Sequence, residues 1–304
     1  MAAQRVAVVT GANKGIGFAI VQGLAKTFDG VVILTACNEQ LGHEAVDKVA
    51  SLAGPATKIK FHQLDITDDS SVKCLAKHLS DEYGGLDVLI NNAAIAYKVA
   101  DTTPFSEQAE VTLRTNFFAT LRSSDEFMSL LRPSARVVTV SSTSALRALS
   151  GCSRELAKRF RDPELSREEL ATLMEKFIKD AKAGNHKANG WPNSAYGMSK
   201  VGVTCLTRIQ AREIGHTRPN DNILINCFCP GWARTDMAGP KATLSPEAGA
   251  VTPLYLAQIP PGASSPHGQF VFEKQVKAFM KQKNRISNDR IKAIFPARAG
   301  VSLA

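Results

Sequence analysis

Short runs of apolar residues alternate along the chain with longer amphipathic stretches, and this alternation limits the folds that the sequence can adopt. Five runs of four to seven residues are rich in Val, Ile and Leu, at residues 6–10, 31–36, 58–64, 88–91 and 136–141. Strands that are buried on both faces read as continuous apolar runs, and parallel strands need helical connections. The pattern therefore predicts an α/β fold with a single, doubly wound parallel sheet of the Rossmann type.

Segments of helical length and period separate these runs, and they lie at residues 15–28, 39–52, 70–82 and 107–131. A further helix is expected at residues 195–213. Two more strand candidates, at residues 223–228 and 268–272, raise the expected sheet to about seven strands. These elements account for most of the chain up to residue 272.

Residues 143–192 break this rhythm, because two helical patterns stand where a short connection is expected. The second pattern has clear start signals, with Ser166 as N-cap and Glu169 three residues later. No Gly-, Ser- or Pro-rich linker separates the stretch from its surroundings. We therefore expect a helical insertion that packs on the main body, within one domain that spans residues 1–272.

The formal net charge of +9 raises the question of a nucleic-acid or membrane partner. Residues 273–304 hold eight Lys and Arg against two acidic residues, so most of the excess lies in this segment, which we expect to be a poorly ordered basic tail. No nucleic-acid-binding signature accompanies the charge, and no apolar stretch reaches the roughly 18 residues of a membrane span. We expect neither kind of partner.

The six cysteines form no disulfide framework typical of secreted domains, and no histidine stands at metal-ligand spacing from Cys227 and Cys229. The N-terminus runs directly into the first expected strand, without a signal-peptide pattern. We therefore expect a cytoplasmic protein without a bound metal.

A glycine-rich turn joins the first strand to the first helix. Gly11, Gly15 and Gly17 follow the spacing G-x-x-x-G-x-G. Such a turn lets backbone N–H groups approach a pyrophosphate, which then lies at the positive end of the helix. The alternative is a strand-to-helix turn with no ligand, but the place of the motif in the first βαβ unit favours dinucleotide binding.

The residues after the second strand bear on the choice of dinucleotide. An acidic residue there would bind the ribose 2′-hydroxyl of NAD, but the strand ends in Cys37 and Asn38. Lys14, inside the glycine turn, can meet a 2′-phosphate instead. Lys14 can also be a solvated loop residue. The sequence favours NADPH.

Tyr196 and Lys200 lie four residues apart at the start of an expected helix, so that both side chains share one face. A phenol exchanges protons poorly near neutral pH, and a cation one turn away is expected to lower its pKa. This pairing suits proton exchange with a carbonyl oxygen. The spacing also arises by chance, so by itself it is weak.

Two further polar residues stand where chemistry is expected. Ser142 follows the fifth strand, and ligands of parallel sheets bind beyond the carboxyl ends of strands. It can equally be the end of a strand and nothing more. Asn116 lies within a helical pattern, where it is either a packing tie or a functional relay.

Taken together, these residues resemble the short-chain dehydrogenase/reductases over residues 5–272. The resemblance rests on Thr10-Gly-Ala-Asn-Lys-Gly-Ile-Gly17, Leu64-Asp-Ile66, Asn91-Asn-Ala-Ala94, Asn116, Ser142, Tyr196, Lys200 and Pro230-Gly-Trp-Ala-Arg-Thr235. The long interval between Ser142 and Tyr196 is similar to the insertion of the monomeric NADPH-dependent carbonyl reductases.

The resemblance implies a role for each matching residue. Tyr196 would protonate the carbonyl oxygen, Lys200 would lower its pKa and hold the ribose, Ser142 would bind the substrate oxygen, and Asn116 would support a water relay. Cofactor contacts would come from Gly11, Asn13, Lys14, Gly15, Ile16, Gly17, Asp65, Ile66, Asn92, Tyr196, Lys200, Pro230, Ala233, Arg234 and Thr235. Ser142, Tyr97, Trp232 and Met237 would line the substrate pocket.

The chain departs from that subgroup at three places. Cys37 and Leu41 stand where arginines usually meet the 2′-phosphate, so Lys14 would carry most of the preference for NADPH. Ala94 replaces a glycine, and Ser144 replaces bulkier pocket residues.

The resemblance implies reduction of aldehydes, ketones or quinones by NADPH. The alternatives are alcohol oxidation by the same residues and a catalytically weak NADP-binding regulatory protein. The insertion would cover the helices that pair subunits in many relatives, so a monomer is expected.

Overall fold

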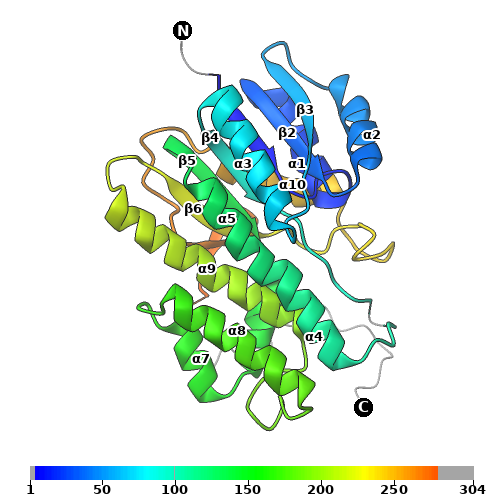
Figure 1. The fold of residues 1–304 in the computed structure, drawn as a ribbon, viewed down its shortest axis with the longest axis vertical. Coiled ribbons are helices and arrows are strands. Elements are labelled where there is room, and N and C mark those ends of the chain that lie inside the picture. Colours follow the sequence, from blue (N-terminus) through cyan, green and yellow to red (C-terminus); the bar gives the residue numbers. More distant parts are fainter. Residues whose placement is uncertain (1–3, 99, 280–304) are drawn as a thin grey trace.

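The computed structural model describes residues 4–98 and 100–279, and one eight-stranded sheet forms its centre (Figure 1). The spatial order of the strands is β3-β2-β1-β4-β5-β6-β7-β8. Their bounds are Val6–Val9 for β1, Gly30–Ala36 for β2, Thr57–Gln63 for β3, Leu86–Asn91 for β4, Leu131–Val140 for β5, Leu224–Cys229 for β6, Phe270–Phe272 for β7 and Gln275–Lys277 for β8. All neighbours are parallel except β7 and β8, so the expected doubly wound parallel sheet is confirmed.

The expectation of about seven strands is wrong by one, because β8 pairs antiparallel with β7. The turn between them places Glu273 and Lys274 at φ of 51° and 59°, a conformation that usually needs Gly or Asn. The sequence therefore holds no turn signal there. The sheet passes residue 272, and Phe279 is buried against the core, whereas residues 280–304 of the expected tail lie outside the described residues.

Helices cover both faces of the sheet. The helices are α1 (Gly15–Thr27), α2 (Glu39–Ala50), α3 (Asp69–Tyr83), α4 (Phe105–Leu113), a π-helical turn (Arg114–Ala119), α5 (Thr120–Met128), α6 (Thr143–Gly151), α7 (Arg154–Arg161), α8 (Arg167–Lys182), α9 (Ala195–Thr217) and α10 (Pro246–Ala257). Alternate residues of β1 face opposite sides: Ala7 and Val9 pack with α1, α2 and α10, and Val6 and Val8 with α3, α5 and α9.

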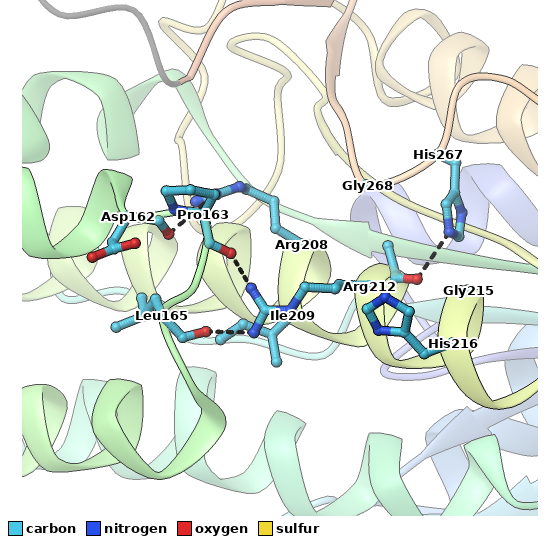
Figure 2. A pocket seen from close by; sticks show the side chains of 11 residues that line it. Asp162, Pro163, Leu165, Arg208, Ile209, Arg212, Gly215, His216, His267 and Gly268 are labelled. Carbon is cyan, nitrogen blue, oxygen red and sulfur yellow. Dashed lines mark hydrogen bonds between the residues drawn. The ribbon is translucent and has the colours of Figure 1, made fainter.

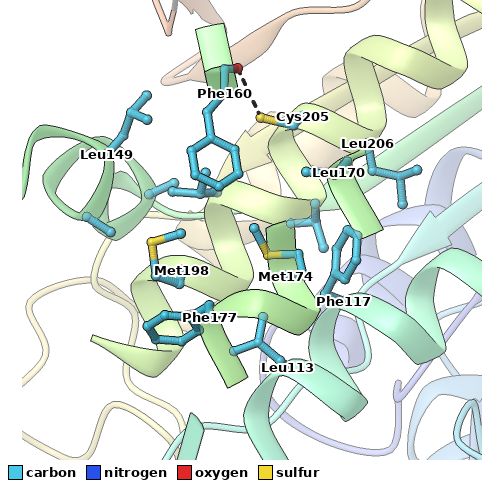
Figure 3. Packing of buried hydrophobic residues seen from close by; sticks show 14 of the residues in the cluster. Leu113, Phe117, Leu149, Phe160, Leu170, Met174, Phe177, Met198, Cys205 and Leu206 are labelled. Atoms are coloured by element: carbon cyan, nitrogen blue, oxygen red, sulfur yellow. Dashed lines mark hydrogen bonds between the residues drawn. The ribbon is translucent and has the colours of Figure 1, made fainter. Parts of the chain in front are cut away.

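The expected insertion folds into α6, α7 and α8 and packs against α4 and α9. Phe117, Met174, Phe177 and Met198 are fully buried in the cluster between them (Figure 3). The Oγ of Ser166 accepts a hydrogen bond from the Glu169 N–H, so the predicted N-cap of α8 is confirmed. Fully burying side chains of this size contributes about 2 kcal/mol each, which holds the insertion on the body.

Candidate active site

A cavity of about 580 Å³ opens at the carboxyl ends of the strands, where a doubly wound sheet places its ligands. The turn after β1, the segments after β4 and β6 and the first turns of α9 form its walls. The residues expected at the site that line it are Gly11, Asn13, Lys14, Gly15, Ile16, Ile66, Asn92, Ser142, Tyr196, Lys200, Pro230, Trp232, Ala233, Thr235 and Met237. Segments far apart in the sequence thus meet at one cavity.

The glycine turn is held to the end of β4 by Asn92. Its Nδ2 donates to the carbonyl oxygens of Thr10 at 2.8 Å and Gly11 at 2.9 Å. A Cβ at Gly17 would lie 2.4 Å from that nitrogen, so only glycine allows this approach. Gly11 and Gly15 have φ of 60° and 61°, in the left-handed region that favours glycine.

The N-terminus of α1 faces the cavity without a capping partner. Lys14 is the N-cap residue but makes no side-chain cap hydrogen bond, and the first turn holds no acidic residue. The unpaired N–H groups of this turn and the helix dipole therefore favour an anion at the wall formed by Asn13, Lys14 and Gly15. This donor set fits the pyrophosphate of a dinucleotide.

Lys14 does not project freely into the cavity. Its Nζ lies 2.7 Å from the Oδ2 of Asp236, across the mouth between the glycine turn and the segment after β6. This contact lowers the pKa of the Asp236 carboxyl, which keeps that carboxylate ionised. Cys37, after β2, also lines the cavity, and its side chain is short.

The Tyr196 phenol and the Lys200 ammonium lie on one face of α9, as their spacing predicts. Lys200 Nζ lies 5.5 Å from the centre of the Tyr196 ring and donates to the Val140 carbonyl oxygen at 2.8 Å. Burial lowers the pKa of Lys200 to about 8, so its ammonium form predominates at neutral pH. The Oγ of Ser194 caps the helix by accepting from Gly197 N at 3.1 Å, which fixes the turn that carries Tyr196.

Burial also raises the pKa of the Tyr196 phenol, and a hydrogen bond with Ser142 opposes that rise. The net shift is opposite to the lowering expected from Lys200, because desolvation penalises the phenolate more than its neighbours stabilise it. Ser142 Oγ accepts from Ser144 N at 3.1 Å as the N-cap of α6, so its own proton is left to donate. The neutral phenol is the form held at this site.

Asn116 lies behind the cavity wall, in the π-helical turn that interrupts the helix expected at residues 107–131. Its Oδ1 accepts from Ile95 N at 2.8 Å, and its Nδ2 donates to Ile95 O at 2.8 Å and to Ser199 Oγ at 3.1 Å. The amide thus ties the segment after β4 to α9. A π-turn holds one more residue than a regular helical turn, and here its Asn116 side chain contacts α9. The hydrophobic pattern of the sequence does not reveal this extra residue.

Five predicted residues do not line the cavity within the described structure. Gly17 and Asn116 lie behind its wall. Asp65 Oδ1 accepts from the N–H and hydroxyl of Thr67, and Arg234 Nη1 donates to the carbonyl oxygens of Ala242 and Thr243. Tyr97 is partly exposed outside it. The Asp65 and Arg234 side chains bond within their own loops, which motif positions alone do not distinguish from contact with a ligand.

Other lining residues were missed by the motif comparison. They are Ile95, Ala96, Thr115, Val140, Asp236 and Ala238, whereas Ala93 and Gly231, which also line the cavity, lie within the recognised motifs. Most directly follow β4 or β6, so the rule that ligands bind beyond strand ends would have found them. Thr115 lies in the π-turn and also lines the wall, and the sequence holds no signal for that turn.

Comparison with known proteins agrees with this geometry. Residues 5–154 match the family model described as short chain dehydrogenase. Carbonyl reductase [NADPH] 1 of Rattus norvegicus is 57% identical over 272 residues, which cover 90% of this chain and 97% of that protein. The chain belongs to the short-chain dehydrogenase family. The human protein of the same name is 55% identical over 272 residues, which cover 90% of this chain and 97% of that protein.

Solved structures of short-chain dehydrogenases share the fold. Salutaridine reductase from Papaver somniferum superposes with a TM-score of 0.77 at 31% identity and covers 89% of this chain and 100% of its own. Among the residues that the structure describes, no helix is long and apolar enough to cross a membrane. In the same residues, no cluster of three or more His, Cys, Asp or Glu side chains is placed to hold a metal ion.

Proposed function

We propose that this short-chain dehydrogenase is an NADPH-dependent carbonyl reductase that converts aldehydes, ketones or quinones to alcohols. One observation carries the proposal: Tyr196, Ser142 and Lys200 meet on the wall of a cavity whose other end is an uncapped, glycine-lined helix N-terminus. The name shared by the 55–57% identical relatives, Carbonyl reductase [NADPH] 1, supports the same activity.

The residues present fit NADPH, and when bound it supplies the hydride that reduces the carbonyl carbon. Gly11, Asn13, Gly15 and Ile16 would hold its pyrophosphate at the N-terminus of α1. Lys14 would bind the 2′-phosphate in place of its contact with Asp236, because β2 is followed by Cys37 and Asn38 and not by an acidic residue. Ile66 and Asn92 would border its adenine and ribose ends. Pro230, Gly231, Trp232, Ala233 and Thr235 would border its nicotinamide end.

Tyr196 donates its proton to the carbonyl oxygen as negative charge develops there. Its raised pKa keeps the phenol protonated until that moment. The Ser142 hydroxyl, anchored by Ser144 N, donates a second hydrogen bond to the same oxygen. The nearby Lys200 ammonium stabilises the phenolate that remains after the transfer, which lowers the free energy of the charged state.

Asn116 acts as a positioning residue in this proposal. Its amide hydrogen bonds hold Ile95, which lines the cavity, against Ser199, which lies between Tyr196 and Lys200 on α9. Ser199 Oγ in turn donates to the Tyr196 carbonyl oxygen at 2.8 Å. The chain of contacts fixes the distance between the substrate wall and the proton donor. These contacts already occupy both Nδ2 hydrogens of Asn116. A water relay at this residue would therefore have to use its other polar atoms.

The protein is further proposed to act as a cytoplasmic monomer on small carbonyl compounds, without a nucleic-acid or membrane partner. Ion pairs support the monomer, because they fasten the insertion over the helices that would otherwise pair subunits. Arg114 contacts Glu175, Lys182 contacts Glu110, and Arg167 contacts both Asp125 and Glu213.

Steady-state kinetics test the activity. NADPH oxidation is followed with a quinone and with an aromatic aldehyde, and NADH replaces NADPH in a parallel series. We expect turnover of both substrates with NADPH and a higher KM for NADH. Absence of turnover with either cofactor over a broad set of aldehydes, ketones and quinones would refute the proposed function.

A further inference from the structure

A second cavity, of about 430 Å³, lies beside the C-terminal half of α9 and shares no lining residue with the catalytic cavity. The turn between α7 and α8 and the segment that enters β7 complete its walls (Figure 2). Its volume falls within the roughly 300–1,000 Å³ of small-molecule sites. Arg208 follows Lys200 by eight residues, so the two cavities are about 12 Å apart along α9.

Basic side chains line one side of this second cavity. Arg208, Arg212 and His216 stand four residues apart, so all three share one face of α9. The guanidinium groups donate to backbone carbonyl oxygens at the end of α7 and in the turn after it, those of Phe160, Asp162, Pro163 and Leu165. These acceptors are neutral, and within residues 4–98 and 100–279 neither arginine forms an ion pair.

The acidic residues nearby do not neutralise these cations. Asp162 lines the cavity, but its carboxylate accepts from Glu164 N at 2.9 Å and lies 3.9 Å from Arg159. Figure 2 shows that carboxylate pointing away from Arg212 and His216. Glu213, next to Arg212 in the sequence, pairs with Arg167. Two guanidinium charges therefore border the cavity without a carboxylate partner.

The remaining walls are neutral. His267 Nε2 bonds to the Ala211 carbonyl oxygen at 3.0 Å and its Nδ1 accepts from Ile225 N at 3.2 Å, while burial lowers its pKa, so the ring stays uncharged. Leu165 and Ile209 are apolar lining residues, and each is about 2% exposed. A guanidinium group has five N–H donors. In Arg208 and in Arg212 two of them donate to backbone carbonyls, so about three N–H groups per arginine remain for a ligand.

We propose that this cavity is a binding site for a small organic phosphate monoester, with the phosphate at Arg208, Arg212 and His216 and the organic group against Ile209 and Leu165. Two arginines and a histidine suit a dianion, which charge-assisted hydrogen bonds hold about twice as strongly as neutral ones. At about 430 Å³ the cavity is larger than a phosphate group, which leaves volume for the organic group.

Phenyl phosphate is the probe, titrated into the ¹⁵N-labelled full chain in the presence of saturating NADP⁺. The dinucleotide fills the catalytic cavity, so the probe cannot bind at the glycine turn. We expect saturable shifts of the amide signals of Gly215 and Gly268, which line the second cavity. Phenol should bind at least about tenfold more weakly. The measurement involves no turnover, so its outcome is separate from that of the proposed reductase activity.

Three variants separate a site from general attraction to a basic protein. Arg212→Gln should weaken phenyl phosphate binding about tenfold, a loss typical of one charged hydrogen-bonding partner. His216→Gln leaves both arginine contacts with the turn intact and should weaken binding severalfold, so it decides the question if Arg212→Gln does not fold. Arg154→Gln removes the same charge from the exposed face of α7 and should change nothing.

Unmoved signals of Gly215 and Gly268 at millimolar phenyl phosphate would overturn the proposal. Equal weakening by Arg154→Gln and by the two cavity variants would overturn it as well, because that result indicates non-specific electrostatics.

Discussion

At the scale of single residues, Cys37 offers a direct test of cofactor choice, because it stands where the resembling subgroup usually carries an arginine. It follows β2 and lines the same cavity as Lys14 and Asp236, which pair with each other. Cys37→Arg should place a second cation at the 2′-phosphate and lower the KM for NADPH about tenfold, because NADH has no phosphate there.

The KM for NADH is the internal comparison, and Cys74→Arg, at an exposed position on α3, is the matched control. An equal improvement with NADH would show that Cys37 does not lie at the 2′ position.

Lys200 gives the reaction a pH dependence. Burial lowers its pKa from 10.5 to about 8, so the ammonium is present below that pH and is lost as the pH rises through it. Because the ammonium stabilises the phenolate left by proton donation, kcat for carbonyl reduction should fall above pH about 8. Lys200→Arg keeps a positive charge over this pH range. The kcat of this variant, although lower than that of the wild type, should therefore not fall above pH about 8. A wild-type rate that stays constant to pH 10 would contradict this role.

Residue-level prediction from the sequence worked where spacing or strand position fixes the direction of a side chain. Tyr196, Lys200 and Ser142 meet at the cavity because one helix turn and one strand end determine where they lie. Arg234 carries no such constraint, and its guanidinium bonds to Ala242 and Thr243 instead. The direction of a long loop side chain depends on which carbonyls the loop presents, and a motif does not encode that.

At the scale of elements, the sequence predicted what a period or a cap records. The helix expected at residues 70–82 lies within α3. The start of α8 was predicted correctly from Ser166 as its N-cap. The helix expected at 107–131 is instead α4, a π-turn and α5, because one inserted residue leaves the apolar pattern nearly unchanged. Strand β8 was not predicted, because the turn that leads into it contains neither Gly nor Asn.

The N-cap of α8 tests how firmly the insertion is held. Ser166→Ala removes the acceptor for Glu169 N and should lower the free energy of unfolding by about 1 kcal/mol. Urea denaturation measures the change. Thr172→Ala, at an exposed position of the same helix, is the control and should not lower the free energy of unfolding, because alanine is the better helix former. Equal stability of Ser166→Ala and the wild type would mean that α8 does not unfold together with the sheet.

At the scale of the whole molecule, the insertion explains the expected oligomeric state. It buries apolar residues of α4 and α9, among them Leu113 and Val201, together with side chains of α8. A surface covered in this way is not available for a second subunit. Light scattering at micromolar concentration should therefore give the mass of one chain, whereas the mass of a stable dimer or tetramer would contradict the monomer.

The central claim is that Tyr196 is the proton donor of a carbonyl reductase, and the kinetics of Tyr196→Phe test it most directly. The variant keeps the ring but loses the hydroxyl, so kcat should fall by at least about 100-fold, as expected for loss of a general acid. NADPH binding, followed by fluorescence, should remain nearly unchanged. Tyr97→Phe, outside the cavity, should keep full activity. A Tyr196→Phe protein that retains most of its kcat would contradict the account.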